Sequence, residues 1–140
     1  MSTDHVLHVS IVTPASVAFE GDALAVSVPG SKSPFQVLYN HAPIISSLDI
    51  GVLKIEAPSN AVTYYAAREG FVEVLKNTVS IVVQELQLGS EIDASKAASE
   101  IEQKRLEWNA AHGRSARESK LRELHWAEAR YRAARLQNGE

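Results

Sequence analysis

Cysteine is absent from this 140-residue sequence, so disulfides and thiolate chemistry are excluded. This absence agrees with a reducing compartment. No segment approaches the ~20 consecutive apolar residues of a membrane-spanning helix. The first residues, Met1 to Val6, lack the basic region and the apolar run of a signal peptide. The formal net charge of −3 is too small to indicate nucleic acid or an anionic membrane surface as a binding partner.

Sequence patterns of catalytic sites are missing as well. No Ser/His/Asp arrangement and no phosphate-binding loop stands out in the sequence. None of the five histidines has another histidine four residues away, which disfavours a metal site; they are His5, His8, His41, His112 and His125. We therefore expect a chain without catalytic residues, without a metal and without a resident cofactor.

Short strand patterns fill the first ninety residues. Leu7, Val9 and Ile11 alternate with polar residues, which predicts a half-buried strand. Similar runs follow, separated by glycine and proline, and Lys76-Asn77 is expected to form a tight hairpin turn. Many short strands without an intervening helix predict an antiparallel β-sandwich or barrel.

A helical pattern begins after Leu88-Gly89-Ser90. We expect a first helix from Asp93 to Ala111, with Asp93, alone or with Ser90, as its N-cap. The residues expected on one face of this helix are Ala94, Ala97, Ile101, Arg105 and Trp108.

A second helix is predicted to follow almost at once. His112-Gly113 is a typical helix end, and Ser115 with Glu118 forms a capping-box pattern. The residues expected on its inner face are Leu121, Leu124, Ala127, Tyr131 and Ala134. So short a connection requires the two helices to turn back on each other. The predicted fold is therefore α+β: an antiparallel β-sandwich over residues 1–89, then an antiparallel two-helix hairpin over residues 90–140.

This hairpin is expected to be held weakly by its own contacts. Its stripes are rich in alanine, and Arg114 to Gln137 carries seven basic and three acidic residues. Three Glu-to-basic pairs at i,i+4 spacing would contribute about 0.2–0.5 kcal/mol each; they are Glu100–Lys104, Glu118–Arg122 and Glu128–Arg132. We expect the hairpin to dock on another surface and to be able to leave it.

One stretch resembles a known protein family. The residues FQVLYNHAPIIS at 35–46, followed by GVLKI at 51–55, resemble the signature of the epsilon subunit of F-type ATP synthases, which corresponds to the mitochondrial delta subunit. The most specific part is Asn40-His41-Ala42-Pro43. VSIVTP at 9–14 and FEG at 19–21 match as well.

The resemblance implies a non-catalytic subunit in the central stalk of a proton-translocating ATP synthase. Its sandwich would be fixed to the gamma subunit, touch the c-ring and couple ring rotation to the catalytic head. Its hairpin would extend toward the catalytic alpha and beta subunits and inhibit ATP hydrolysis. The chain would be peripheral, bound to the cytoplasmic face of a bacterial plasma membrane only through the complex. A bacterial setting is favoured because no Arg-rich transit segment precedes Val6.

The resemblance also assigns contacts with gamma and the c-ring to two stretches. They comprise Ser31, Lys32, Ser33, Pro34 and Phe35, and then Tyr39, Asn40, His41, Ala42, Pro43 and Ile44. This sequence departs from the family pattern there: Ser33 and Gln36 replace glycines, Tyr39-Asn40 replaces Pro-Gly, and Pro34 replaces a frequently acidic residue. For His41, a loop histidine that hydrogen-bonds the backbone is an equal alternative.

The segment from Glu91 to Ala97 resembles the Ile/Leu-Asp-x-x-Arg-Ala motif with which some bacterial epsilon subunits bind ATP. It implies nucleotide contacts for Ile92, Asp93, Lys96 and Ala97, with phosphate contacts from Arg114, Arg117 and Arg122. Lys96 replaces the arginine, however, and a point charge does not reproduce a planar guanidinium. The alternative is a plain capped helix start. Two other functions stay open: an ATP-sensing regulatory module whose hairpin folds around nucleotide, and an unrelated scaffolding protein.

Overall fold

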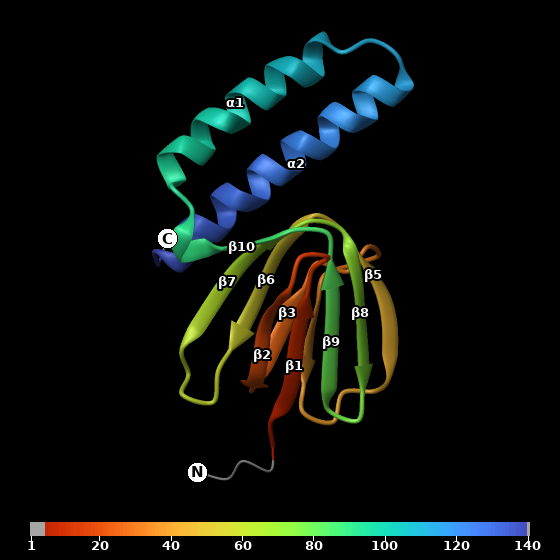
Figure 1. The fold of residues 1–140 in the computed structure, drawn as a ribbon, viewed down its shortest axis with the longest axis vertical. Helices are drawn as coiled ribbons and strands as arrows, with labels where there is room; N and C mark the ends of the chain where they lie inside the picture. The colour runs from red at the N-terminus through yellow and green to blue at the C-terminus, as the bar shows by residue number, and fades with distance from the viewer. Residues whose placement is uncertain (1–4, 140) are drawn as a thin grey trace.

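Two stacked β-sheets, followed by two antiparallel helices, make up the computed structural model, which describes residues 5–139 (Figure 1). This arrangement confirms the predicted fold class. The expectation that no signal peptide is present concerns Met1 to Val6, most of which lies outside the described residues. Among the described residues, no helix combines the length and the apolar character needed to cross a membrane.

Within residues 5–139, each sheet has five strands. The first has the order β2-β1-β9-β8-β5, with β2 Val17–Ala23, β1 Leu7–Val12, β9 Thr78–Val83, β8 Gly70–Leu75 and β5 Ile44–Leu48. The second has the order β10-β7-β6-β3-β4, with β10 Leu86–Leu88, β7 Val62–Ala67, β6 Gly51–Glu56, β3 Ala25–Val28 and β4 Phe35–Leu38. The neighbouring strands are antiparallel except for β1 and β9, which run parallel. The alternation of residues gave no sign of this parallel pair.

The space between the sheets is filled by aliphatic side chains. Leu7, Val9 and Ile11 of β1 are buried while His8 is exposed, as the alternation predicted. They pack in one cluster with Leu53 of β6 and Ile81 of β9. This cluster is the core that stabilises the sandwich.

The tight turns lie where the sequence predicted them. Lys76 and Asn77 connect β8 and β9 with φ angles of 49° and 63°, the left-handed pair that a two-residue hairpin turn requires. Asn40, between β4 and β5, also has a positive φ, of 66°.

The hairpin follows a short 3₁₀ turn, η1 (Gly89–Glu91). Helix α1 spans Ala94–Ala110, and helix α2 spans Arg114–Gln137. Asp93 is the N-cap of α1, because its Oδ1 accepts a hydrogen bond from the backbone N–H of Lys96 at 3.1 Å. This confirms the predicted cap.

The predicted capping box of α2 is wrong. The N-cap of α2 is Gly113, with a φ of 90° and no side-chain hydrogen bond. Because the positive φ of this glycine lets the helix begin at Arg114, Ser115 already lies within the first turn. Glu118 pairs with Arg114 instead, at 3.1 Å.

The predicted i,i+4 ion pairs are also wrong, because these side chains have other partners. Lys104 pairs with Glu107 and Glu118 with Arg114, each within one helix, while other charges connect different elements. Glu100 of α1 pairs with Arg130 of α2, and Arg122 of α2 pairs with Glu69 of the sandwich. Among the ion pairs of the described residues, none joins Glu128 to Arg132. The charges therefore tie helix to helix and helix to sandwich.

Helix α2 has two buried sides. Leu124, Ala127 and Ala134 of its predicted inner face are buried. Trp126, Ala129 and Ala133 are buried too, although they lie outside that stripe, and they pack in one cluster with Ala66 of β7. In α1, Arg105 was expected on one face together with Ala97 and Trp108; Ala97 is buried, whereas Arg105 is exposed and pairs with Glu102. Helix α2 thus lies between α1 and the second sheet (Figure 1).

Candidate functional site

The two stretches expected to contact a partner lie side by side along one edge of the sandwich. The chain crosses there from β4, at the edge of the second sheet, to β5, at the edge of the first. The backbone N–H of Ser31 donates to the carbonyl of Ser47 at 3.0 Å. The rings of Phe35 and His41 are 6.2 Å apart. The fold therefore places residues 31–35 and 39–44 on one continuous edge.

Several residues of this edge also have internal structural roles. The backbone N–H of Asn40 donates to Oδ1 of Asn77 at 2.6 Å, which ties the loop to the turn between β8 and β9. Nδ1 of His41 hydrogen-bonds the carbonyl of Ala42 at 2.7 Å, the contact that the loop-histidine alternative predicts. The ring of Tyr39 meets that of His5 edge-on at 4.8 Å. By contrast, Ala42 and Pro43 are exposed, as are Ser31, Lys32, Ser33 and Pro34.

An apolar surface on the outer face of the first sheet was missed from the sequence. Large apolar side chains are exposed there at outward-facing positions: Val17 60%, Ile45 74%, Phe71 62%, Leu75 46% and Val82 51%. Val17 and Val82 are both paired with Val12, and Val82 is paired with Phe71, so Val17, Val82 and Phe71 lie along one line across the sheet. Ile45 and Leu75 lie farther along β5 and β8 on the same face. The sequence did contain a sign of this surface, because β9 has valine at an outward position as well as at inward ones. We call these five exposed residues the apolar row.

A shallow hollow joins the apolar row to the predicted edge. It has a volume of about 450 Å³ and is lined by Pro43, Ile44, Ile45, Glu73, Val74 and Leu75. Pro43 and Ile44 belong to the predicted contact stretch, and Ile45 and Leu75 to the apolar row. The exposed surface is therefore continuous from the loop onto the sheet.

Arg68 connects the sandwich to the hairpin. It lies between β7 and β8; its Nε donates to Glu85 at 3.0 Å and its Nη1 donates to Glu123 of α2 at 3.2 Å. Its guanidinium lies 4.8 Å from the centre of the Trp126 ring. Burial disfavours its charge, but the hydrogen bonds with Glu123 and Glu85 outweigh this and raise its pKa. Arg68 is thus a charged group held between the two parts of the molecule.

The residues of the ATP-like motif have separate environments. Ile92 and Ala97 are buried, Asp93 caps α1, and Lys96 is exposed. Arg114 lies at the other end of α1, whose 17 residues span about 26 Å.

The three arginines already have protein partners. Arg117 donates to the carbonyls of Trp108 and Ala111, at 3.1 and 3.3 Å. Arg114 pairs with Glu118, and Arg122 with Glu69 at 2.7 Å. In the docked hairpin these arginines are not brought to Asp93 and Lys96.

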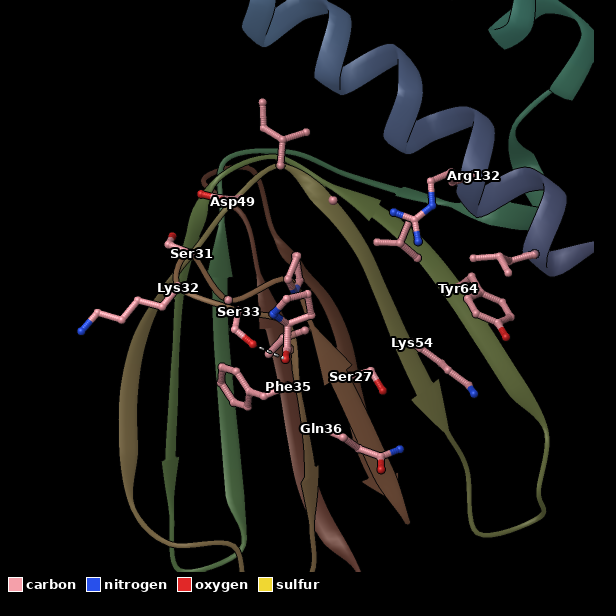
Figure 2. Close-up of a pocket in the computed structure, with 18 residues that line it drawn as sticks. Ser27, Ser31, Lys32, Ser33, Phe35, Gln36, Asp49, Lys54, Tyr64 and Arg132 are labelled. Carbon is pink, nitrogen blue, oxygen red and sulfur yellow. Dashed lines mark hydrogen bonds between the residues drawn. The ribbon is translucent and has the colours of Figure 1, made fainter.

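A larger hollow lies between the second sheet and the C-terminal half of α2 (Figure 2). Its volume is about 750 Å³, and residues 31–35 form one side of it. Lys54 and Tyr64 reach it from the sheet, and Arg132 from α2 (Figure 2). Among the described residues, no group of three or more histidine or acidic side chains is placed to hold a metal ion.

The sequence is similar to a known protein family over most of its length. The model of the family described as "ATP synthase, Delta/Epsilon chain, beta-sandwich domain" matches residues 6–89. The ATP synthase epsilon chain of Leptospira borgpetersenii serovar Hardjo-bovis is 38% identical over 101 residues, which cover 70% of this chain and 79% of that protein. The ATP synthase epsilon chain of Microcystis aeruginosa is 35% identical over 130 residues, covering 90% and 93%.

Solved structures share the fold. A chain in the mitochondrial ATP synthase of Euglena gracilis superposes with a TM-score of 0.82 at 20% identity, covering 97% of this chain and 84% of that one. A chain in the central stalk and c-ring of the Tetrahymena thermophila mitochondrial ATP synthase gives a TM-score of 0.63 at 15% identity, covering 91% and 96%. At these identities the likeness concerns the fold, which includes both the sandwich and the helices.

Proposed function

The chain belongs to the family of ATP synthase delta and epsilon chains, which are non-catalytic stalk subunits of the synthase, and we propose that it couples c-ring rotation to the catalytic head and restrains ATP hydrolysis. In this proposal the sandwich binds the gamma subunit and the c-ring. The hairpin acts on the catalytic alpha and beta subunits. The single observation that carries the docking part is the exposed apolar row.

The apolar row has the character of a surface that a partner covers. Single exposed apolar residues are normal on a protein surface, but five large ones on one sheet face form a patch of the kind that marks an interaction site. The hairpin leaves this face free, because α2 packs against β6 and β7 of the other sheet. We assign gamma to the apolar row and the hollow beside it, and the c-ring to the edge formed by residues 31–35 and 39–44.

The hairpin has the character of an element that can leave its docking site. Its contact with the sandwich rests on alanines, on Trp126 and on ion pairs such as Arg68–Glu123. In the docked form its basic residues are largely engaged, as in Arg122–Glu69 and Arg130–Glu100. Release would free them for acidic surfaces of the catalytic subunits.

We also propose a place in the cell. The bacterial relatives support a peripheral subunit on the cytoplasmic face of the plasma membrane, bound to the membrane only through the complex. Neither a metal nor a nucleic acid is part of the proposal.

Purification of the complex tests the docking part. A tagged chain should recover gamma, c-ring and catalytic subunits from native membranes. Phe71→Asp should abolish this recovery, because it places a charge in the apolar row, whereas Leu106→Asp, at an exposed apolar position on α1, should leave gamma bound. Recovery of the tagged chain alone, while the synthase stays assembled, would contradict the proposal.

Removal of the hairpin tests the regulatory part. Deleting residues 91–140 should leave coupling largely intact and raise ATP hydrolysis. Loss of assembly on that deletion, or unchanged hydrolysis, would contradict the regulatory role.

The ATP-sensing alternative predicts something different for the isolated chain. ATP at about 100 times its Kd would stabilise the fold by about 2.7 kcal/mol, which a thermal melt would register. An unchanged melt would exclude this alternative.

A further inference from the structure

We propose that Gln137 acts as a clamp that takes the place of a missing strand on β7, and that this clamp controls whether the hairpin is docked. The inference rests on the proposed release of the hairpin. It concerns the last turn of α2 and the edge of the second sheet.

The edge of β7 is only partly covered by β10. The pairing of the two strands ends where Leu88 faces Tyr65, although β7 continues back to Val62. Beyond that point the side chain of Gln137 takes over. Its Oε1 accepts from the backbone N–H of Tyr64 at 2.8 Å, and its Nε2 donates to the carbonyl of Val62 at 3.1 Å. A carboxamide offers the same acceptor and donor as a peptide group, so Gln137 completes the edge as a strand would.

Gly89 allows the helix to approach this edge. It is buried, and a Cβ built on it would lie 2.7 Å from the carbonyl oxygen of Ala133 and 2.9 Å from that of Tyr64. Any side chain at this position would push the backbone of α2 away from β7. The residue that directly follows β10 is therefore also the one that lets α2 approach the edge of β7.

These contacts are coupled. Ala133 and Gln137 lie one turn apart on α2. The carbonyls of Ala133 and Tyr64 both face the position of Gly89, and Gln137 hydrogen-bonds the backbone of Tyr64. Displacing the helix from Gly89 therefore also withdraws the carboxamide. The clamp involves no formal charge, so it should hold in salt that weakens the ion pairs of Arg68 and Arg122.

The fluorescence of Trp126 can report whether the hairpin is docked on the sandwich. It is 7% exposed, between α2 and the sandwich, whereas Trp108, the second tryptophan of the chain, lies near the far end of α1. In the full-length chain with Trp108→Phe, quenching of Trp126 fluorescence by acrylamide reports the undocked fraction.

The decisive variant is Gln137→Met, which keeps the length of the side chain and removes both hydrogen bonds. We expect the ratio of docked to undocked hairpin to fall about tenfold, from the loss of two net hydrogen bonds. Gly89→Ala should have a similar or larger effect. The matched control is Gln103→Met, at an exposed glutamine of α1, which should leave quenching unchanged.

The inference fails if Trp126 stays equally protected in Gln137→Met, or if the control behaves like the variant. Should Gly89→Ala not fold, Gln137→Met still decides the question. Because the measurement uses the isolated chain, its result is independent of whether the chain binds ATP synthase subunits. Failure of the clamp and failure of the proposed stalk function can therefore be told apart.

Discussion

The interior between the two sheets and the contact between α2 and the second sheet are built from different residues. The interior is filled by branched aliphatic side chains with essentially no exposure, among them Leu7, Ile11, Leu53 and Ile81. The buried residues at the helix contact are mainly alanines, such as Ala66, Ala129 and Ala133, and the large buried side chains of that cluster are Trp126 and Ile92.

Because of this difference, burial stabilises the sandwich interior much more than it stabilises the docked hairpin. Each buried methylene contributes about 0.8 kcal/mol, so an alanine contact contributes far less than a leucine or isoleucine contact. The helix contact is completed by polar groups, namely Arg68 with Glu123 and Gln137 with the edge of β7. The sandwich is thus built to remain folded, while the hairpin is held by contacts that can be exchanged for others.

The largest expected effect belongs to the sandwich interior. Leu53→Ala should lower the free energy of unfolding by about 2–5 kcal/mol, because it leaves a cavity at a fully buried position. Leu106→Ala, at a leucine that is 68% exposed, should change it by less than about 0.5 kcal/mol. Urea denaturation of both variants checks the comparison. Equal effects would mean that the burial of Leu53 does not stabilise the sandwich interior.

A smaller and more local effect is expected at Arg68. Arg68→Ala removes the hydrogen bonds with Glu123 and the stacking on Trp126, and should weaken docking by about 1–3 kcal/mol. Hydrogen exchange should accelerate in α2 and stay unchanged in β1. Arg68→Lys should restore only part of the protection, since an ammonium cannot stack and pair as a guanidinium does. Equal acceleration in β1 would show that the hairpin and the sandwich unfold as one unit.

Sequence reasoning succeeded where local rules determine the structure. Alternation identified the buried face of β1, Lys76-Asn77 identified a hairpin turn, and Asp93 was correctly assigned as a helix cap. Each of these depends on residues close together in the chain. The resemblance in residues 35–55 gave the family, which residue patterns alone could not.

What the sequence missed depends on contacts between distant segments. The parallel pairing of β1 with β9 and the pairing of Arg122 with Glu69 arise only once the sheets and α2 are assembled. Trp126 was not assigned to a buried face because the stripe chosen for α2 assumed a single partner. The apolar row was missed because strands were read for their buried face alone. The edge contact of Gln137 joins residues more than seventy positions apart, beyond any local rule.

The effect of ionic strength on hairpin docking tests how much the exposed ion pairs contribute to it. The pair between Arg122 and Glu69 is largely exposed and should contribute about 0.2–1 kcal/mol to docking. Arg122→Gln should therefore increase the quenching of Trp126 slightly at low salt. In high salt the variant and the parent chain should become alike, because screening removes the same interaction. A difference that persists in high salt would mean that Arg122 contributes mainly through packing.

The smallest expected effect lies at the far end of the hairpin and depends on pH. The hydrogen bond from Lys120 to Glu107, at 3.1 Å, lowers the pKa of the Glu107 carboxyl; burial opposes this shift, and the charges of Lys104 and Lys120 add to it. Because the folded pKa is below the unfolded one, the stabilisation is present above the usual range of glutamate and is lost as the pH falls through the folded pKa. Glu107→Gln should therefore lower the helical melting temperature slightly at about pH 7 and leave it equal to that of the parent chain at about pH 3. Most ion pairs of the described residues lie within the hairpin or between it and the sandwich, so acid should loosen the hairpin before the sandwich. A difference between the two proteins that stayed constant across this range would show that Glu107 acts through packing, and that the hairpin tip is not held by its charge.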